Sequence, residues 1–146
     1  MYKIEKVSSE KIRPLRHKAL RQGKPYSTTG YLRDQDPQTL HLAVLVKKEI
    51  VTCATFYPEE FKKTENINAY RLRGMATSKE HRRKGYGKKI MKEAIDLLKQ
   101  KKCDLLWCNA RLVALDFYKS LGFITTGKMF EIKDIGPHYV MYKKIQ

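Results

Sequence analysis

The stretch AYRLRGMATSKEHRRKGYGKKIMKEAIDLLKQ, residues 69–100, predicts a strand, a glycine loop and a helix in direct succession. Residues 69–77 have the composition of a strand. Gly74 lies inside it, and a glycine there indicates a bulge or a close approach to the backbone. From Tyr86 to Lys101 the apolar residues follow a helical period. Those on one helical face are Ile90, Met91, Ala94, Ile95 and Leu98.

The connection into that helix is strongly basic. Residues 80–89, EHRRKGYGKK, contain six basic residues when His81 is counted, and two glycines, Gly85 and Gly87. The first N–H groups of a helix have no internal partner and carry the positive end of the helix dipole. Glycines let an anion approach these N–H groups closely, so the stretch predicts a phosphate cradle. A solvated basic face that caps the helix is the alternative interpretation.

Two common phosphate motifs are excluded by spacing. The sequence GYGKK lacks the GxxxxGK[ST] pattern of a Walker A loop. A dinucleotide fingerprint, GxGxxG, would need glycine at residue 90, which is Ile90. The predicted anion therefore belongs to another kind of site.

The rest of the chain predicts a mixed order of strands and helices. Residues 2–7, 40–57, 104–109, 123–132 and 138–145 have strand patterns, and residues 40–57 form a hairpin around Lys47-Lys48-Glu49. Residues 8–23 predict a helix with Ser8 or Ser9 as N-cap, either kinked or restarted at Pro14. Residues 110–122 predict a second amphipathic helix, residues 24–38 a turn-rich mobile loop, and residues 58–68 a polar connection. This order predicts an α/β or α+β sandwich in one domain, residues 1–146.

The composition favours a globular domain over a disordered or membrane-spanning chain. The chain has 146 residues, of which 42% are hydrophobic and 32% charged, a mixture typical of a globular domain. The start of the chain is charged from its third residue and does not resemble a signal peptide, and no apolar run is long enough to cross a membrane. Cys53, Cys103 and Cys108 form no CxxC pair, so we expect reduced thiols, no metal site and a cytoplasmic protein.

The formal net charge of +16 predicts attraction to anions in general. RNA, acidic membranes and phosphorylated cofactors all fit this charge. Charge alone does not choose among them.

Two motifs resemble the GNAT superfamily of acyl-CoA N-acyltransferases. RRKGYG, residues 82–87, matches the [QR]-x-x-G-x-[GA] pyrophosphate loop of that family, and ALDFYKSLGF, residues 114–123, resembles its A-x-x-F-Y-x-x-x-G-F signature. The segments YRLRGMAT, DLLWCNAR and IGPHYVMYK, with LRHKALR near the start, are most similar to the glyphosate N-acetyltransferase branch. The resemblance implies a mixed central sheet of about six to seven strands, splayed in the middle and flanked by helices.

The resemblance also implies acetyl-CoA as co-substrate. The pyrophosphate is expected on the main chain at the helix start, with charge from the preceding basic residues, and the pantetheine arm beside the strand that ends at Thr77. The residues implied are Met75, Ala76, Thr77, Arg82, Arg83, Lys84, Gly85, Tyr86, Gly87, Lys88, Asn109 and Tyr118. From the residues alone, residues 75–77 would be ordinary strand core.

Acetyl transfer to an amine needs a base and a proton donor. An alkylammonium is mostly protonated at neutral pH, so a base that removes its proton assists the reaction. His138 is the candidate because imidazole titrates near neutrality, and in the resembled branch the matching histidine is the base. Tyr118 matches the family tyrosine that gives a proton to the leaving thiolate. Taken from the residues alone, His138 is a structural residue at a strand start and Tyr118 a core tyrosine.

Three arginines match substrate ligands of the resembled branch: Arg21, Arg73 and Arg111. Guanidinium groups suit phosphonate and carboxylate because they donate two parallel hydrogen bonds. His41 and His138 are expected beside them. The resemblance therefore implies a small anionic amine as substrate, glyphosate-type amines included, with transfer in a ternary complex. We expect a monomer or homodimer, with no nucleic-acid or membrane partner.

Rival interpretations remain open at this level. A protein or peptide acetyltransferase acting on lysines or N-termini would have the same motifs but an acidic groove. An RNA-binding protein would combine basic residues with exposed stacking aromatics, whereas the aromatics here lie mostly within apolar periods. A non-catalytic acetyl-CoA sensor would not need His138 and Tyr118.

Overall fold

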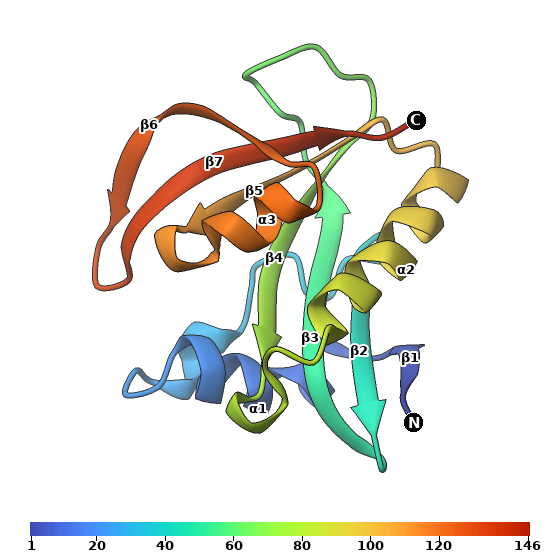
Figure 1. Ribbon diagram of the computed structural model, residues 1–146, viewed down its shortest axis with the longest axis vertical. Coiled ribbons are helices and arrows are strands. Elements are labelled where there is room, and N and C mark those ends of the chain that lie inside the picture. Colours follow the sequence, from blue (N-terminus) through green and yellow to red (C-terminus); the bar gives the residue numbers. More distant parts are fainter. The chain divides into compact units, whose positions relative to one another are not determined.

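Seven strands form one mixed sheet in the computed structural model, which describes residues 1–146 (Figure 1). The strand order is β1-β2-β3-β4-β5-β7-β6. The strands are β1 (Lys3–Lys6), β2 (Leu40–Val46), β3 (Glu49–Pro58), β4 (Ala69–Thr77), β5 (Leu105–Arg111), β6 (Ile124–Ile132) and β7 (Gly136–Lys144). The helices are α1 (Ser9–Leu20), α2 (Tyr86–Gln100) and α3 (Leu115–Ser120), with short 3-10 turns η1 (Tyr26–Thr29), η2 (Lys79–His81) and η3 (Leu112–Ala114).

The chain packs as two units. Residues Met1–Tyr57 and Leu72–Leu97 form the first, called here the N-terminal unit, and residues Pro58–Arg71 and Leu98–Gln146 form the C-terminal unit. Strand β4 and helix α2 each contribute residues to both units. No helix of the structure has the length and apolarity needed to cross a membrane.

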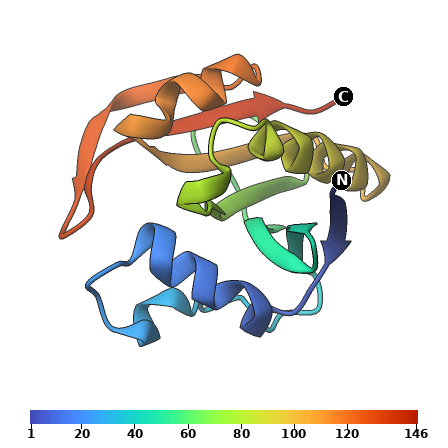
Figure 2. The ribbon, with the colours of Figure 1, turned by 60° about the horizontal axis from the view of Figure 1, so that its bottom comes forward.

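In the N-terminal unit, strands β1, β2 and β3 pair antiparallel, and helices lie on both sides of them (Figure 2). Successive side chains of a strand point to opposite faces. Ile12 and Leu15 of α1 pack on one face against Ala43, Cys53 and Ala76, all of which are buried. Because residues from three strands meet one helix here, this cluster holds α1 in place.

Helix α1 also buries a charge. The side chain of Arg16 is fully buried, and Nη1 and Nη2 donate hydrogen bonds to the two carboxylate oxygens of Asp34 over 2.8 and 3.1 Å. Nη1 also donates to the carbonyl oxygen of Thr29, and Nη2 to the hydroxyl of Thr55 on β3. One side chain therefore ties α1 to the segment 24–38 and to the sheet, although we expected that segment to be a mobile loop.

The C-terminal unit is built on a ladder of three strands. The first residues of β4 pair parallel with β5, from Ala69 opposite Leu105, while β7 pairs antiparallel with both β5 and β6. Phe61 packs against the rings of Trp107 and Tyr142, with centroids 5.3 and 5.2 Å apart. The connection 58–68 was predicted as polar, but Phe61 within it is a core residue with 3% exposure.

Most predicted elements are present, and the fold class is confirmed as a mixed sheet of seven strands flanked by helices. Helix α1 runs unbroken through Pro14. The predicted helix 110–122 is shorter than expected, because Ala110 and Arg111 extend β5 as partners of Tyr139 and His138. Only residues 115–120 remain α-helical.

We predict that Asp34→Asn lowers the free energy of unfolding by about 3 to 5 kcal/mol, because it leaves the Arg16 cation buried without its counterion. Burial alone would raise the pKa of Asp34, but hydrogen bonds from Arg16 and from the Tyr31 N–H outweigh it and hold the pKa below the ordinary 3.8. The contribution is therefore present above pH 3.8 and lost as the pH falls through the lower folded-state pKa.

The matched control is Asp36→Asn, which removes an exposed ion pair with Arg33. Exposed pairs contribute about 0 to 1 kcal/mol, so this variant should unfold almost like the native protein. Urea unfolding at several pH values measures both. Equal stabilities of the two variants at neutral pH would contradict the prediction.

Candidate active site

The glycine loop has the backbone that an anion cradle needs. Arg83 and Gly85 adopt left-handed conformations, with φ of +64° and +84°. The N–H of Lys89 donates to the carbonyl oxygen of Gly85 over 3.1 Å, which makes Gly85 the residue that caps α2. The N–H groups of Tyr86, Gly87 and Lys88 then have no acceptor within the helix. They form an open row of donors at its positive end.

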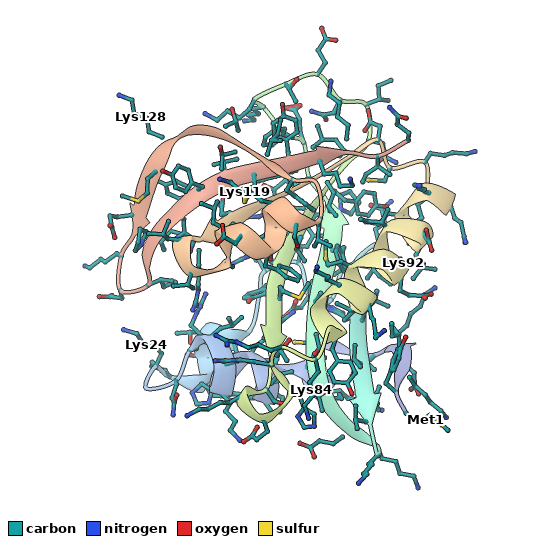
Figure 3. All side chains as sticks on the ribbon, viewed as in Figure 1. Met1, Lys24, Lys84, Lys92, Lys119 and Lys128 are labelled. Carbon is teal, nitrogen blue, oxygen red and sulfur yellow. The ribbon has the colours of Figure 1, made fainter.

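The space in front of this row is open and surrounded by cations. A Cβ placed on Gly85 would meet no atom within 4 Å. Arg82, Arg83, Lys84 and Lys88 are exposed, and Figure 3 shows Lys84 on the loop ahead of α2. Arg82 is partly engaged, since its Nε donates to the carbonyl oxygen of Thr77. The chemistry of this donor set fits a diphosphate.

Residues 75–77 form the end of β4 and directly follow Gly74, where the strand bends. Gly74 has a φ of +66°, and a Cβ on it would lie 3.0 Å from the Tyr31 ring, in keeping with the expected close approach to the backbone. The side chain of Ala76 is 4% exposed and belongs to the core, so only its main chain can meet a ligand. Met75 and Thr77 are half-buried, and the Thr77 hydroxyl bonds that of Thr52. The predicted divergence of β4 from β5 stays a prediction.

Arg21 and Arg73, the two arginines predicted to bind substrate from the N-terminal unit, contact different groups of the protein. Arg21 ends α1 and donates to the carbonyl oxygen of Leu20. The guanidinium of Arg73 lies over the ring of Tyr31, 4.0 Å from its centroid, and makes no hydrogen bond or ion pair. The prediction from sequence did not include Tyr31, which lies in a segment without a strong motif.

His41 is engaged within the protein. Its Nε2 donates to the carbonyl oxygen of Asp34 over 2.9 Å, so Nδ1 of the neutral ring accepts from the Thr55 hydroxyl over 2.8 Å. Burial lowers the pKa of His41, against the opposing effect of Asp34. With both nitrogens bonded and 6% exposure, His41 has a structural role in this network. Its predicted contact with substrate has no support from these bonds.

The C-terminal unit brings Arg111 and His138 together. They are direct partners in the β5–β7 ladder, so their side chains emerge on the same face. Nδ1 of His138 donates to the carbonyl oxygen of Gly136 over 2.8 Å. Because a carbonyl only accepts, the proton of the neutral ring is on Nδ1, and Nε2 keeps its lone pair. Asn109 lies half-buried two residues before Arg111 on the same strand.

Tyr118 is buried on α3 between Phe117 and Phe123, with ring centroids 5.1 and 5.4 Å away. Burial raises the pKa of Tyr118 well above 10, and the nearby Cys108 adds to the effect. Its hydroxyl has no hydrogen-bond partner in the structure. Burial also raises the pKa of Cys108 to about 12, so this thiol stays protonated.

Outside the predicted site, the molecule has an open hollow but no metal-binding cluster. An open hollow of about 350 Å³ in the N-terminal unit lies between α1 and η2 and is lined by residues such as Pro14, Lys18 and His81. No three His, Cys, Asp or Glu side chains gather in a way that could hold a metal ion.

The predicted site residues therefore form two groups. The N-terminal unit holds the glycine loop, residues 75–77, Arg21, Arg73 and His41, and the C-terminal unit holds Asn109, Arg111, Tyr118 and His138. That the two groups line one cleft stays a prediction.

Comparison with known proteins shows the family. A family model described as Acetyltransferase (GNAT) family matches residues 5–123, so the chain belongs to the GNAT family. The protein is an acetyl-CoA-dependent N-acetyltransferase.

Individual relatives agree with this assignment. An uncharacterized N-acetyltransferase of Bacillus subtilis (strain 168), YitI, is 32% identical over 146 residues, which cover 100% of this chain and 98% of the relative. An aminoglycoside 6'-N-acetyltransferase solved with coenzyme A has the same fold, with a TM-score of 0.78 at 12% identity over 99% of this chain and 97% of that chain. The NatC complex bound to Gag peptide and CoA gives a TM-score of 0.79 at 17% identity over 99% of both chains. One of these two proteins is an aminoglycoside acetyltransferase and the other is a complex bound to a peptide, so the shared fold leaves the substrate open.

We predict that Tyr118 of the folded, ligand-free protein keeps its proton at a pH at which ordinary tyrosines have ionised, because burial raises its pKa well above 10. In an alkaline titration followed by ultraviolet absorbance, Tyr118→Phe should show the same tyrosinate signal as the native protein up to about pH 11, because ordinary tyrosines ionise near pH 10 and Tyr118 lies well above. Loss of one tyrosinate in Tyr118→Phe would contradict the prediction.

Proposed function

We propose that the protein transfers the acetyl group of acetyl-CoA to the amine of a small substrate that bears phosphonate, phosphate or carboxylate groups, as in the glyphosate N-acetyltransferase branch. The observation that supports this most directly is the pairing of Arg111 with His138 across β5 and β7. It puts a permanent cation beside the proposed base. An amine with an anionic group would be gripped by the first and deprotonated by the second.

Arg73 and Arg21 extend the cationic surface in the proposal. The guanidinium of Arg73 keeps its N–H donors available, because it stacks on an aromatic ring and makes no hydrogen bond or ion pair within the protein. Two anionic groups on one substrate would need two such cations. We place the reaction in the cytoplasm, in keeping with three buried free cysteines, and in a monomer or homodimer.

The glycine loop binds the diphosphate of coenzyme A in this proposal. The N–H groups of Tyr86, Gly87 and Lys88 donate to it, and Arg82, Arg83 and Lys84 add charge. The main chain of residues 75–77 and the amide of Asn109 pair with the pantetheine arm. These contacts keep the acetyl group next to the amine.

His138 and Tyr118 move the protons. Nε2 of His138 accepts the proton of the ammonium form, because Nδ1 is already committed to Gly136. Tyr118 is neutral and its hydroxyl is unpaired, so it supplies a proton to the leaving sulfur. A strand N–H near Met75 or Ala76 would stabilise the oxyanion.

One assay tests the substrate class. Pure protein and acetyl-CoA are incubated with amino phosphonates, phosphoamino acids, polyamines and basic peptides, and release of CoA is followed. Turnover confined to anionic amines supports the proposal. Turnover of peptides alone would replace it with a peptide acetyltransferase, and CoA binding without turnover of any amine would favour the sensor.

We predict that Gly85→Ala raises the Kd for CoA at least about 10-fold, because the residue has a left-handed backbone and its side chain would enter the open space of the cradle. Gly127→Ala is the matched control. It has a φ of +76° and no atom within 4 Å of a Cβ, but it lies on β6. Calorimetry should give the control a native Kd, while both variants lose about 1 kcal/mol of stability. Equal Kd values would refute the cradle.

We predict that His138→Gln lowers kcat by about 100- to 10,000-fold without changing the Kd for CoA, since a general base contributes about this much. Steady-state kinetics measure kcat, and calorimetry measures the Kd for CoA. A variant with native kcat would show that His138 is structural.

A further inference from the structure

The ring of Tyr31 lies between two guanidinium groups. The central carbon of Arg16 is 3.9 Å from the ring centroid, and that of Arg73 is 4.0 Å from it. The two arginines come from α1 and β4, and Tyr31 comes from the segment 24–38 between α1 and β2. Two cations of like charge are thus stacked through one aromatic ring.

The Arg16 side of this stack is fixed. The four hydrogen bonds of its two terminal nitrogens go to Asp34, Thr29 and Thr55, at 2.6 to 3.1 Å. Its Nε has no acceptor, and the residue is fully buried. An arginine held in this way cannot turn toward a ligand, so it acts as a support for the ring.

The backbone of Tyr31 is held by the same ion pair. Its N–H donates to Oδ2 of Asp34 over 2.9 Å, and its carbonyl oxygen accepts from the Asp34 N–H over 3.0 Å. The ring also rests on Gly74, because a Cβ there would lie 3.0 Å from the ring carbon Cε2 and from the hydroxyl. The ring position is therefore set by α1, by its own loop and by the kink in β4.

The Arg73 side is different. This residue is half-buried, directly precedes Gly74, and has the Tyr31 ring as its one electrostatic or hydrogen-bonding partner. The stack uses the face of the guanidinium, and its N–H donors lie at the edge. Arg73 is therefore held in place without losing the donors that an anion needs.

We propose that Tyr31 is a positioning residue for substrate binding: it holds the guanidinium of Arg73 ready to receive an anionic group of the amine substrate. The inference rests on the proposed function and gives the segment 24–38 a part in substrate selection. A cation–π contact is worth about 0.5 to 2 kcal/mol, and a preorganised ligand saves the cost of ordering it on binding.

Kinetics test the inference with two variants. Tyr31→Leu removes the aromatic face and should raise KM for the anionic amine about 3- to 30-fold, with kcat and KM for acetyl-CoA within about twofold of native. Tyr31→Phe keeps the face and should restore the native KM. Leu32→Ala, next to it and 98% exposed, is the control for general disturbance of the segment. A purely structural role would change all parameters together.

A double variant separates indirect from direct action. If Tyr31 acts through Arg73, Arg73→Gln combined with Tyr31→Leu should have the same KM as Arg73→Gln alone. Additive effects would mean that Tyr31 contacts substrate by itself, and native KM in Tyr31→Leu would mean that it does nothing; either result overturns the inference.

A measurement without turnover distinguishes this inference from the proposed function. In NMR spectra of the native protein, the ring should shift the Arg73 side-chain signals upfield, and titration with inorganic phosphate should move them. Tyr31→Leu should lose the upfield shift and bind phosphate about 3- to 30-fold more weakly, and Tyr31→Phe should keep both. Unshifted Arg73 signals, or equal phosphate affinity in native and Tyr31→Leu, would overturn the positioning role even if anionic amines are acetylated. Absence of such acetylation would instead overturn the proposed function.

Discussion

The N-terminal unit depends on the hydrogen bonds that compensate for burying the guanidinium of Arg16. Removing such a charge from water costs several kcal/mol, and the structure offsets this only by surrounding it with acceptors. These are supplied by Asp34 and Thr29 of the segment 24–38 and by Thr55 of β3. Asp34 and Thr55 also engage the two nitrogens of His41 on β2. One buried cation therefore attaches a loop of turn-forming residues to α1 and β3, and His41 links the same network to β2.

The C-terminal unit is organised by backbone pairing instead. Strand β7 lies between β5 and β6, and this register decides that His138 stands opposite Arg111 on one side and Phe130 on the other. The bond from Nδ1 to Gly136 then selects the ring tautomer. The protonation of Tyr118 has a different cause: burial among aromatic rings raises its pKa and keeps its hydroxyl protonated. The protonation of the proposed acid and the tautomer of the proposed base are thus set by their surroundings.

Family and substrate are determined at different levels of the structure. In the proposal, the glycine loop and the start of α2 hold the diphosphate of the co-substrate with main-chain groups. The solved structures that share this fold include an aminoglycoside 6'-N-acetyltransferase and the NatC complex bound to Gag peptide. The proposed substrate contacts of this chain come instead from single arginine side chains and from the segment 24–38. Such side chains can change without disturbing the sheet, so one fold can serve different functions.

The sequence by itself determined the family, the order of elements and the glycine loop before α2, because these depend on local signals. A helical period fixes α2 within its own residues, and Gly74 and Gly85 mark left-handed backbone positions that other residues avoid. Only the tertiary structure decided that Arg16 is buried, that His41 is a structural residue, and that Tyr31 lies between two arginines. Each of these depends on partners from other elements of the chain, and the bonds of Arg16 to Thr29 and Thr55 span 13 and 39 residues. A local pattern cannot specify them, since an arginine on a helix or a tyrosine in a loop is solvated until the fold supplies its neighbours.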